Sequence, residues 1–265
     1  MSITMQDVIA ELRGDVPLIP DTADTLEGAA METPVKGIAV AFMPSQTVIE
    51  QAVALGANLL VVHESPYYSH RPEHASHLAD DPVCRVKRDF LRQSGLAVYR
   101  HHDYCHRLQP DPIMSGLLQS LAWEAQVEAM LPTAAVVRVP AMRASELAAY
   151  AKAKLSLPYV RLTGDPDMRC ERVGVLVGYR GGGANAIPLF REHKLDLVLA
   201  GEGPEWETPE YVRDAASQGS PKSLLAIGHA ESEEPGMRAV AEQLRGRYSE
   251  LPVHFIPGQP VFRVI

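Results

Sequence analysis

Short apolar runs alternate with segments of helical periodicity along this chain, and this alternation is the feature that most restricts its fold. The clearest example starts with a strand-like run over residues 35–42 and ends with another over residues 57–62. Between them, Ser45 is placed to cap a helix whose apolar residues recur at helical spacing as far as Gly56. Buried parallel strands are continuously apolar, and a strand–helix–strand unit joins parallel neighbours. The pattern therefore predicts an α/β protein.

The same unit recurs in the second half of the chain. Residues 37–40 (Gly-Ile-Ala-Val) correspond to residues 174–177 (Gly-Val-Leu-Val), and the run that ends at Glu64 corresponds to one that ends at Glu202. So long a period excludes a solenoid repeat and favours a duplicated domain. We therefore expect two similar α/β domains with a metal cleft between them. The expected boundaries are 1–125 plus 235–265 for the first domain and 126–234 for the second.

Histidines and carboxylates follow the predicted strands at four places. They are His63 with Glu64, the segment from His101 to His106, Glu202, and His229 with Glu233. Side chains at the carboxyl ends of parallel strands point into the crevice where open α/β sheets bind ligands. Imidazole and carboxylate groups without thiolates are typical ligands of catalytic Fe, Mn or Zn. Six or so such donors favour two ions that share a bridging water.

Structural interpretations compete for other residues. Three further histidines, His70, His74 and His77, lie in a polar stretch that favours a solvated loop, and His193 and His254 are interpreted as structural. The glycine run at residues 181–183 could cradle a phosphate, but no Lys-Ser/Thr pair follows it.

The ends of the predicted elements give further expectations. Ser145 is expected to cap a helix, and Ser232 another, with His229 before that helix and Glu233 in its first turn. The chain is expected to finish with strand-like segments at residues 253–256 and 261–264.

Composition excludes several classes of protein. The formal net charge of −8 argues against binding to nucleic acid or to anionic membranes, and no apolar run is long enough to span a bilayer. The amino-terminal residues 1–12 are polar and acidic, which predicts a short helix rather than a signal peptide. Three cysteines without metal-like spacing fit a reducing compartment, so we expect a cytoplasmic protein.

The strand-end motifs resemble those of the NIF-three-like family, dinuclear-metal proteins often described as homologues of a type-two GTP cyclohydrolase I. The resemblance spans about residues 21–244. Its motifs are Gly-Ala-Asn-Leu-Leu-Val-Val-His-Glu, Tyr-Arg-His-His-Asp-Tyr-Cys-His and Gly-His-Ala-Glu-Ser-Glu-Glu-Pro-Gly-Met. It implies the NIF-three-like fold, a toroidal homohexamer and two divalent ions.

The resemblance also implies a ligand set. The candidate metal ligands are His63, Glu64, Asp103 or His106, His229 and Glu233. The family's first motif usually ends in two histidines, so Glu64 is a departure. The family's middle ligand is an aspartate, for which this chain offers both Asp103 and His106.

The leading hypothesis is a metal-dependent hydrolase that uses two ions of Fe, Mn or Zn and a bridging water. Its substrate would be a nucleotide, a phosphoester or an amide, and nothing outside the metal clusters indicates which. Glu202 or Glu205 is expected to transfer the proton. The alternative is a non-enzymatic, oligomeric metal-binding or adaptor protein.

Overall fold

The computed structural model describes residues 2–265, apart from the side chains of Pro72 and Glu73. Met1, the first residue of the predicted amino-terminal helix, lies outside the described residues. The chain divides into two compact units, which we call unit 1 (residues up to 112 and Gly236–Val261) and unit 2 (Ile113–Pro235 and Phe262–Ile265). The chain thus enters unit 2 thirteen residues before the boundary expected from the sequence. Among residues 2–265, no helix is both long and apolar enough to cross a membrane.

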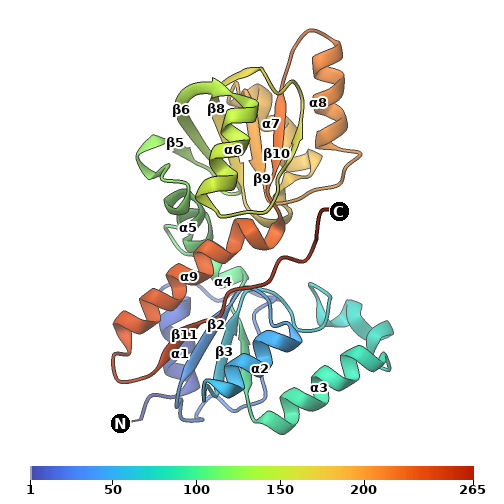
Figure 1. Cartoon of the computed structure of the whole chain (residues 1–265). Coiled ribbons are helices and arrows are strands. Elements are labelled where there is room, and N and C mark those ends of the chain that lie inside the picture. The colour runs from blue at the N-terminus through green and yellow to red at the C-terminus, as the bar shows by residue number, and fades with distance from the viewer. Residues whose placement is uncertain (1) are drawn as a thin grey trace. The chain divides into compact units, whose positions relative to one another are not determined.

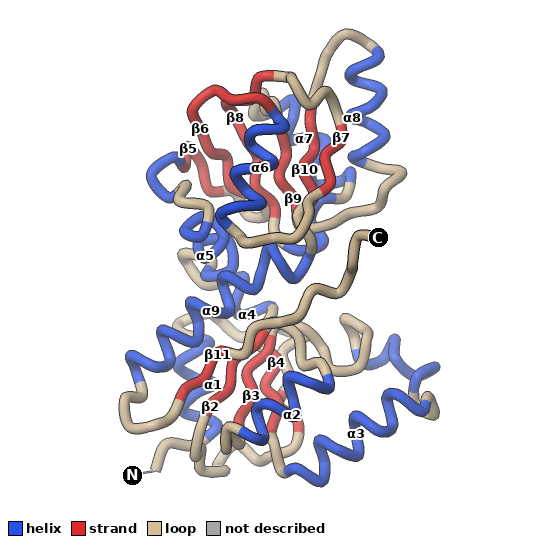
Figure 2. The backbone as a smooth tube through the Cα atoms, viewed as in Figure 1, coloured by secondary structure: helices blue, strands red, loops and turns tan. Residues whose placement is uncertain are grey.

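Unit 1 is built on a sheet with the strand order β1-β4-β3-β2-β11 (Figures 1 and 2). Its elements are α1 (Met5–Arg13), β1 (Leu26–Glu27), β2 (Ile38–Ala41), α2 (Gln46–Ala54), β3 (Leu59–Val62), the 3₁₀ helix η1 (Pro72–Leu78), α3 (Pro82–Ser94), β4 (Ala97–Arg100), α4 (Asp103–Arg107) and β11 (Val253–Phe255). Strands β11, β2, β3 and β4 are parallel, and β1 is antiparallel at the edge. The carboxyl ends of β3 and β4 therefore lie side by side.

Local sequence explains the helices of unit 1. Ser45 caps α2 by accepting a hydrogen bond from the Val48 amide, and Gly56, which follows the helix, has a φ of +75°. Glycine adopts this left-handed conformation without the steric cost of a Cβ, and both predicted ends of this helix are confirmed. Figure 1 shows α2 in front of the sheet and α1 behind it. The buried face of α2 packs with α3 on alanine, leucine and valine side chains of β2, β3 and β4.

Unit 2 is built on a second sheet with the strand order β5-β6-β8-β9-β10-β7 (Figure 1). Its elements are α5 (Pro112–Ser120), η2 (Glu124–Gln126), β5 (Val127–Met130), β6 (Ala135–Arg143), α6 (Ala144–Lys154), β7 (Arg161–Thr163), β8 (Arg169–Leu176), η3 (Gly178–Gly181), α7 (Gly183–Glu192), β9 (Leu197–Ala200), α8 (Thr208–Ser217), β10 (Ser223–Ala226) and the start of α9 (His229–Arg247). Strands β8, β9 and β10 are parallel, and the outer strands β5, β6 and β7 join antiparallel. Helices α7 and α8 pack on one face of this sheet.

The two units share the predicted strand–helix–strand core. In unit 1, β2 pairs with β3 from Ile38↔Leu59 to Ala41↔Val62. In unit 2, β8 pairs with β9 from Val173↔Leu197 to Leu176↔Ala200. Both pairs are parallel, and a helix connects the strands of each pair, so the mixed α/β class with two domains is confirmed.

The start of α6 and the carboxyl-terminal segment differ from the sequence prediction. Ser145 does not cap α6, because the helix already begins at Ala144 and Arg143 stands at the cap position. Residues 261–264 do not form a strand, and Val261, Phe262 and Val264 are at least 72% exposed.

Candidate metal centre

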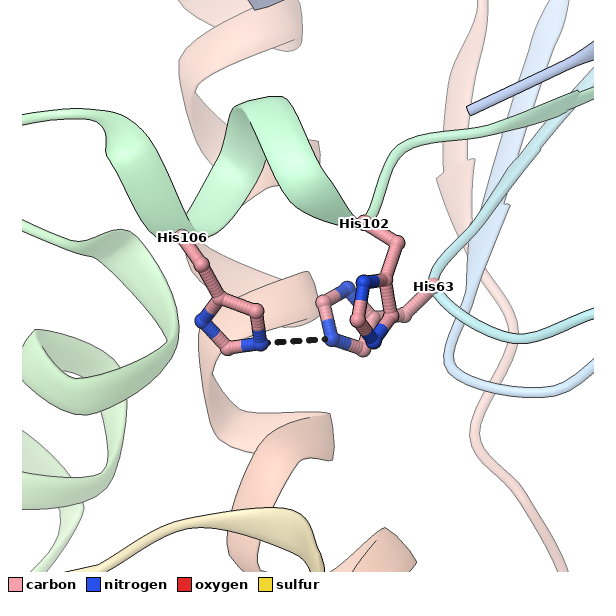
Figure 3. Close-up of side chains that lie close together, drawn as sticks. All are labelled: His63, His102 and His106. Carbon is pink, nitrogen blue, oxygen red and sulfur yellow. Dashed lines mark hydrogen bonds between the residues drawn. The ribbon is translucent and has the colours of Figure 1, made fainter. Parts of the chain in front are cut away.

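Three histidines of unit 1 converge at the carboxyl ends of β3 and β4 (Figure 3). His63 follows β3 directly, and the parallel register Val62↔Arg100 brings the end of β4 beside it. The chain then turns into α4, so that His102 precedes the helix and His106 lies one turn later. The rings of His63 and His102 stack with centroids 4.6 Å apart, and the His106 ring meets His63 edge-on at 4.9 Å.

The partner of each Nδ1 atom defines the tautomer of these imidazoles. His63 Nδ1 lies 2.9 Å from the His101 carbonyl oxygen, which can only accept, so this nitrogen donates. His102 Nδ1 lies 2.9 Å from an Asp103 carboxylate oxygen, and His106 Nδ1 lies 3.0 Å from one of Asp111. A neutral imidazole that donates through Nδ1 carries its lone pair on Nε2.

The lone pairs of the cluster face one another. The Nε2 atoms of His63 and His106 are 3.2 Å apart, and one ring nitrogen from each of the three histidines lies within 4.8 Å of the other two. Two nitrogen lone pairs at this separation repel each other unless a cation lies against both. Burial also holds the pKa of His63 well below its ordinary value, which keeps this ring neutral and able to ligate. The donor set therefore fits a divalent metal ion.

Asp103 orients a histidine of this cluster. Its carboxylate accepts from His102 and also from the Ala23 amide at 2.7 Å and the Thr22 hydroxyl at 3.2 Å. The hydrogen bond from His102 is the main reason that the pKa of Asp103 lies well below its ordinary value. Of the two alternatives for the middle ligand, the structure thus places His106 in the three-histidine cluster and Asp103 behind His102.

Arg100 occupies the space beside Glu64. This guanidinium is almost fully buried and donates to Glu64 Oε2 at 2.8 Å, to the His63 carbonyl at 3.1 Å and to the His70 carbonyl at 2.6 Å. It also lies 3.1 Å from His70 Nδ1, which must accept because a guanidinium has only donors. His70 then carries its proton on Nε2, the wrong tautomer for a ligand through that atom.

A second possible group of donors, Glu64, His70 and His102, therefore already has a cation, the guanidinium of Arg100. His70 is exposed, as expected for a residue of a solvated loop. Its contact with Arg100 places it beside Glu64 and His102.

Unit 2 has its own candidate group of metal ligands, which lies where β9 and β10 end. Glu202 follows β9, and His229 and Glu233 lie one turn apart in the first part of α9. His229 Nδ1 is 2.8 Å from Glu202 Oε1, and His229 Nε2 is 3.1 Å from Glu233 Oε2. The hydrogen bond with His229 lowers the pKa of Glu202. Glu202 thus relates to His229 as Asp111 relates to His106, and Nε2 of His229 faces a carboxylate that could share a metal ion with it.

The start of α9 corrects the sequence prediction. His229 is the first residue of the helix, because Gly228 with a φ of +111° turns the chain straight out of the strand end. Ser232 lies inside the helix instead of capping it. Its buried hydroxyl donates to the His229 carbonyl at 2.7 Å and accepts from the Gly178 amide at 2.8 Å.

Two other sequence candidates lie elsewhere. The side chain of Glu205 is 80% exposed, and its described ion pair is with Arg161 at 3.0 Å. At the glycine run, the Gly183 amide donates to the Glu207 carboxylate at 2.6 Å. The Glu207 carboxylate therefore binds the amide at the start of α7, which is the position where the glycine run could have held a phosphate.

Sequence reasoning missed Asp24, Arg100 and Asp111. Asp24 is 9% exposed, and its carboxylate accepts from the amides of His102, Asp103 and Tyr104, which fixes the start of α4. It lies 79 positions before Asp103, so no spacing rule connects them. Asp111 lies between two prolines just before α5, and Arg100 is the last residue of β4, so neither position indicates a role at the site.

Comparisons with known proteins identify a family for this chain. The sequence model of the Duf34/NIF3 (NGG1p interacting factor 3) family matches residues 26–260. A curated Escherichia coli K12 protein, a "GTP cyclohydrolase 1 type 2 homolog", is 26% identical over 235 residues, which cover 84% of each chain.

Solved structures share the fold at lower identity. A Bacillus cereus protein related to NIF3 has a TM-score of 0.75 at 14% identity and covers 100% of this chain and 99% of its own. A Staphylococcus aureus hypothetical protein has a TM-score of 0.73 at 14% identity, with 100% of both chains covered. At such identities the likeness concerns the fold alone.

Proposed function

Because this chain belongs to the Duf34/NIF3 family, we propose that it is a divalent-metal protein and that it hydrolyses a small substrate with metal-activated water. The observation that carries the proposal is the His63–His102–His106 cluster, in which each Nδ1 has an acceptor and one ring nitrogen of each histidine lies within 4.8 Å of the other two. Histidines held in this way by carboxylates and carbonyls are typical of metal ligands. A bound divalent ion would supply a water of lowered pKa and a positive charge near the reacting bond.

The finer proposal is two ions per chain. The unit 1 cluster would hold one, and His229 with Glu233 of unit 2 would ligate the other. Glu64 remains a proposed ligand through Oε1, since Arg100 holds Oε2. The three imidazoles favour Zn or Fe, and the carboxylates of the second set admit Mn. Glu202 would position His229, and we assign it no separate proton transfer.

Metal content tests the first part. We expect wild-type protein to bind Zn²⁺ and the His102→Ala and His106→Ala variants to bind it at least about tenfold more weakly, measured by competition with a chromogenic chelator. His77→Ala, which changes an exposed histidine of the η1 segment, is the matched control. Unchanged affinity in both cluster variants would refute the assignment.

Turnover tests the second part. The protein is assayed against phosphoesters, nucleotides and peptides with and without chelator, beside a His229→Ala variant. Turnover that chelator and the variant both remove supports the hydrolase. Metal binding without turnover on any substrate favours the oligomeric adaptor. The homohexamer and the cytoplasmic location also remain proposals, which light scattering and cell fractionation test.

A further inference from the structure

A cavity of about 240 Å³ lies in unit 1 against the residues that hold Glu64. Arg100, which pairs with Glu64, lines this cavity, and Ser65, the residue after Glu64, lines it as well. The segment after β3 forms one wall through Ala75, Ser76, Leu78 and Ala79. Helix α3 contributes Cys84 and Arg88, and β1 contributes Glu27. A molecule bound here would touch the side chain that fixes Glu64.

A second cavity, of about 360 Å³, adjoins the first along the edge of the sheet. Glu27, Tyr67 and Arg88 line both cavities and so lie where they meet. Ligand sites usually measure about 300–1,000 Å³ and combine apolar walls with a few polar groups. The second cavity by itself falls within this range, and Glu27, Tyr67 and Arg88 line it beside apolar side chains such as Leu96 and Val98.

The side chains of Glu27 and Arg88 place two opposite charges at the junction. Within the part of the chain that the structure describes, neither Glu27 nor Arg88 forms an ion pair. Arg88 donates to the Ala79 carbonyl at 3.2 Å and lies 5.5 Å over the Tyr67 ring. Burial raises the pKa of Glu27, and the nearby Arg88 charge only partly opposes this. The other guanidiniums of the two cavities are matched, Arg92 by Asp89 and Arg100 by Glu64.

We propose that these cavities bind a small zwitterion of the amino acid and short-peptide class, with its ammonium group at Glu27 and its carboxylate at Arg88. A ligand with both charges would form a direct ion pair with each side chain, and charge-assisted hydrogen bonds are stronger than neutral ones. The Tyr67 ring would cover its apolar part, together with Ala75, Leu78 and Ala79 in the first cavity or Leu91, Leu96 and Val98 in the second. If the proposed function holds, such a ligand would be an amide substrate, but binding itself requires no metal.

Calorimetry on metal-free wild-type protein in chelator tests the proposal. The probes are L-alanyl-L-alanine, its N-acetyl derivative, which lacks the ammonium group, and its carboxamide, which lacks the carboxylate. We expect the dipeptide to bind at least about tenfold more tightly than either capped form, which corresponds to about 1.4 kcal/mol. Equal binding of all three probes, or no binding at millimolar concentration, would overturn the proposal.

Variants assign the two ends. Glu27→Gln should remove the preference for the free ammonium group, and Arg88→Gln should remove the preference for the free carboxylate, while Arg88→Lys keeps part of it. The exposed positions Glu50→Gln and Arg85→Gln are the matched controls. Discrimination that survives in folded Glu27→Gln and Arg88→Gln protein would contradict the proposal. Because metal is absent, these results are independent of whether the protein is a hydrolase.

Discussion

Glu202 Oε1 and His229 Nδ1 lie 2.8 Å apart, and Asp111 Oδ2 and His106 Nδ1 repeat this relationship at 3.0 Å in the other unit. Each carboxylate keeps the proton of its histidine on Nδ1 and makes Nε2 the basic nitrogen. Carboxylates in this position raise the basicity of a ligating imidazole and hold its ring in place.

Asp111→Asn should therefore weaken metal binding in unit 1 by about 10- to 100-fold without unfolding the protein. Chelator competition measures the affinity, and circular dichroism monitors the fold. Asp15→Asn, a change at an exposed carboxylate, should leave the affinity unaltered. An Asp111→Asn variant with wild-type affinity would show that His106 does not depend on this contact.

Arg100→Met should be strongly destabilising in metal-free protein. It leaves the mostly buried carboxylate of Glu64 without its partner at 2.8 Å, and breaking a buried pair in this way costs about 3–5 kcal/mol. Urea unfolding measures the change. The double variant Arg100→Met with Glu64→Met removes both charges and should recover much of the loss, so additive single effects would argue against a coupled pair.

Lys87 predicts a change of stability with pH. Its buried ammonium group donates to the Pro66 carbonyl at 2.7 Å, and burial lowers its pKa to about 8. Because the pKa in the unfolded chain is higher, about 10.4, the folded state releases this proton first as pH rises. The penalty of the buried charge is therefore present in full below pH 8 and is lost progressively above it.

We thus expect the stability of wild-type protein relative to Lys87→Met to increase by about 2 kcal/mol between pH 7.5 and 10. Denaturant unfolding at both pH values measures the free energy of unfolding of each protein. Subtracting the two values removes the contribution of every titratable group that the two proteins share. The exposed helical Lys152→Met should show no such trend. A difference that stays constant with pH would contradict the buried charge.

Gly178→Ala should displace the side chains of Glu233 and His229, the proposed metal ligands of unit 2. Gly178 has a φ of +58°, and a Cβ there would overlap the Glu233 carboxylate and lie 3.1 Å from His229 Nε2. We expect a loss of about 1–3 kcal/mol in stability and weaker metal binding by His229 and Glu233. Gly246→Ala, in an open part of α9, should instead stabilise by about 0.5–1 kcal/mol. Equal behaviour of the two variants would mean that the close approach to Glu233 is unimportant.

The sequence by itself determined the elements whose causes are local. Continuous apolar runs such as Leu59–Val62 form buried parallel strands. Ser45 caps the start of the helix between two of them, and Gly56 follows its end. The histidines and glutamates at strand ends could be identified because a parallel sheet places all such ends on one edge. These inferences need only neighbours in the chain and the geometry of a βαβ unit.

The tertiary structure decided what each polar group does. Asp103 and His106 were equivalent candidates in the sequence, and only the position of His102 between Asp103 and His63 separates an orienting carboxylate from a ligand. Asp24 and Arg100 act across 30 or more positions, through His102 and His70, so their roles have no local signature. A hydrogen bond depends on distances and directions of a few tenths of an ångström, and spacing along a chain does not encode them.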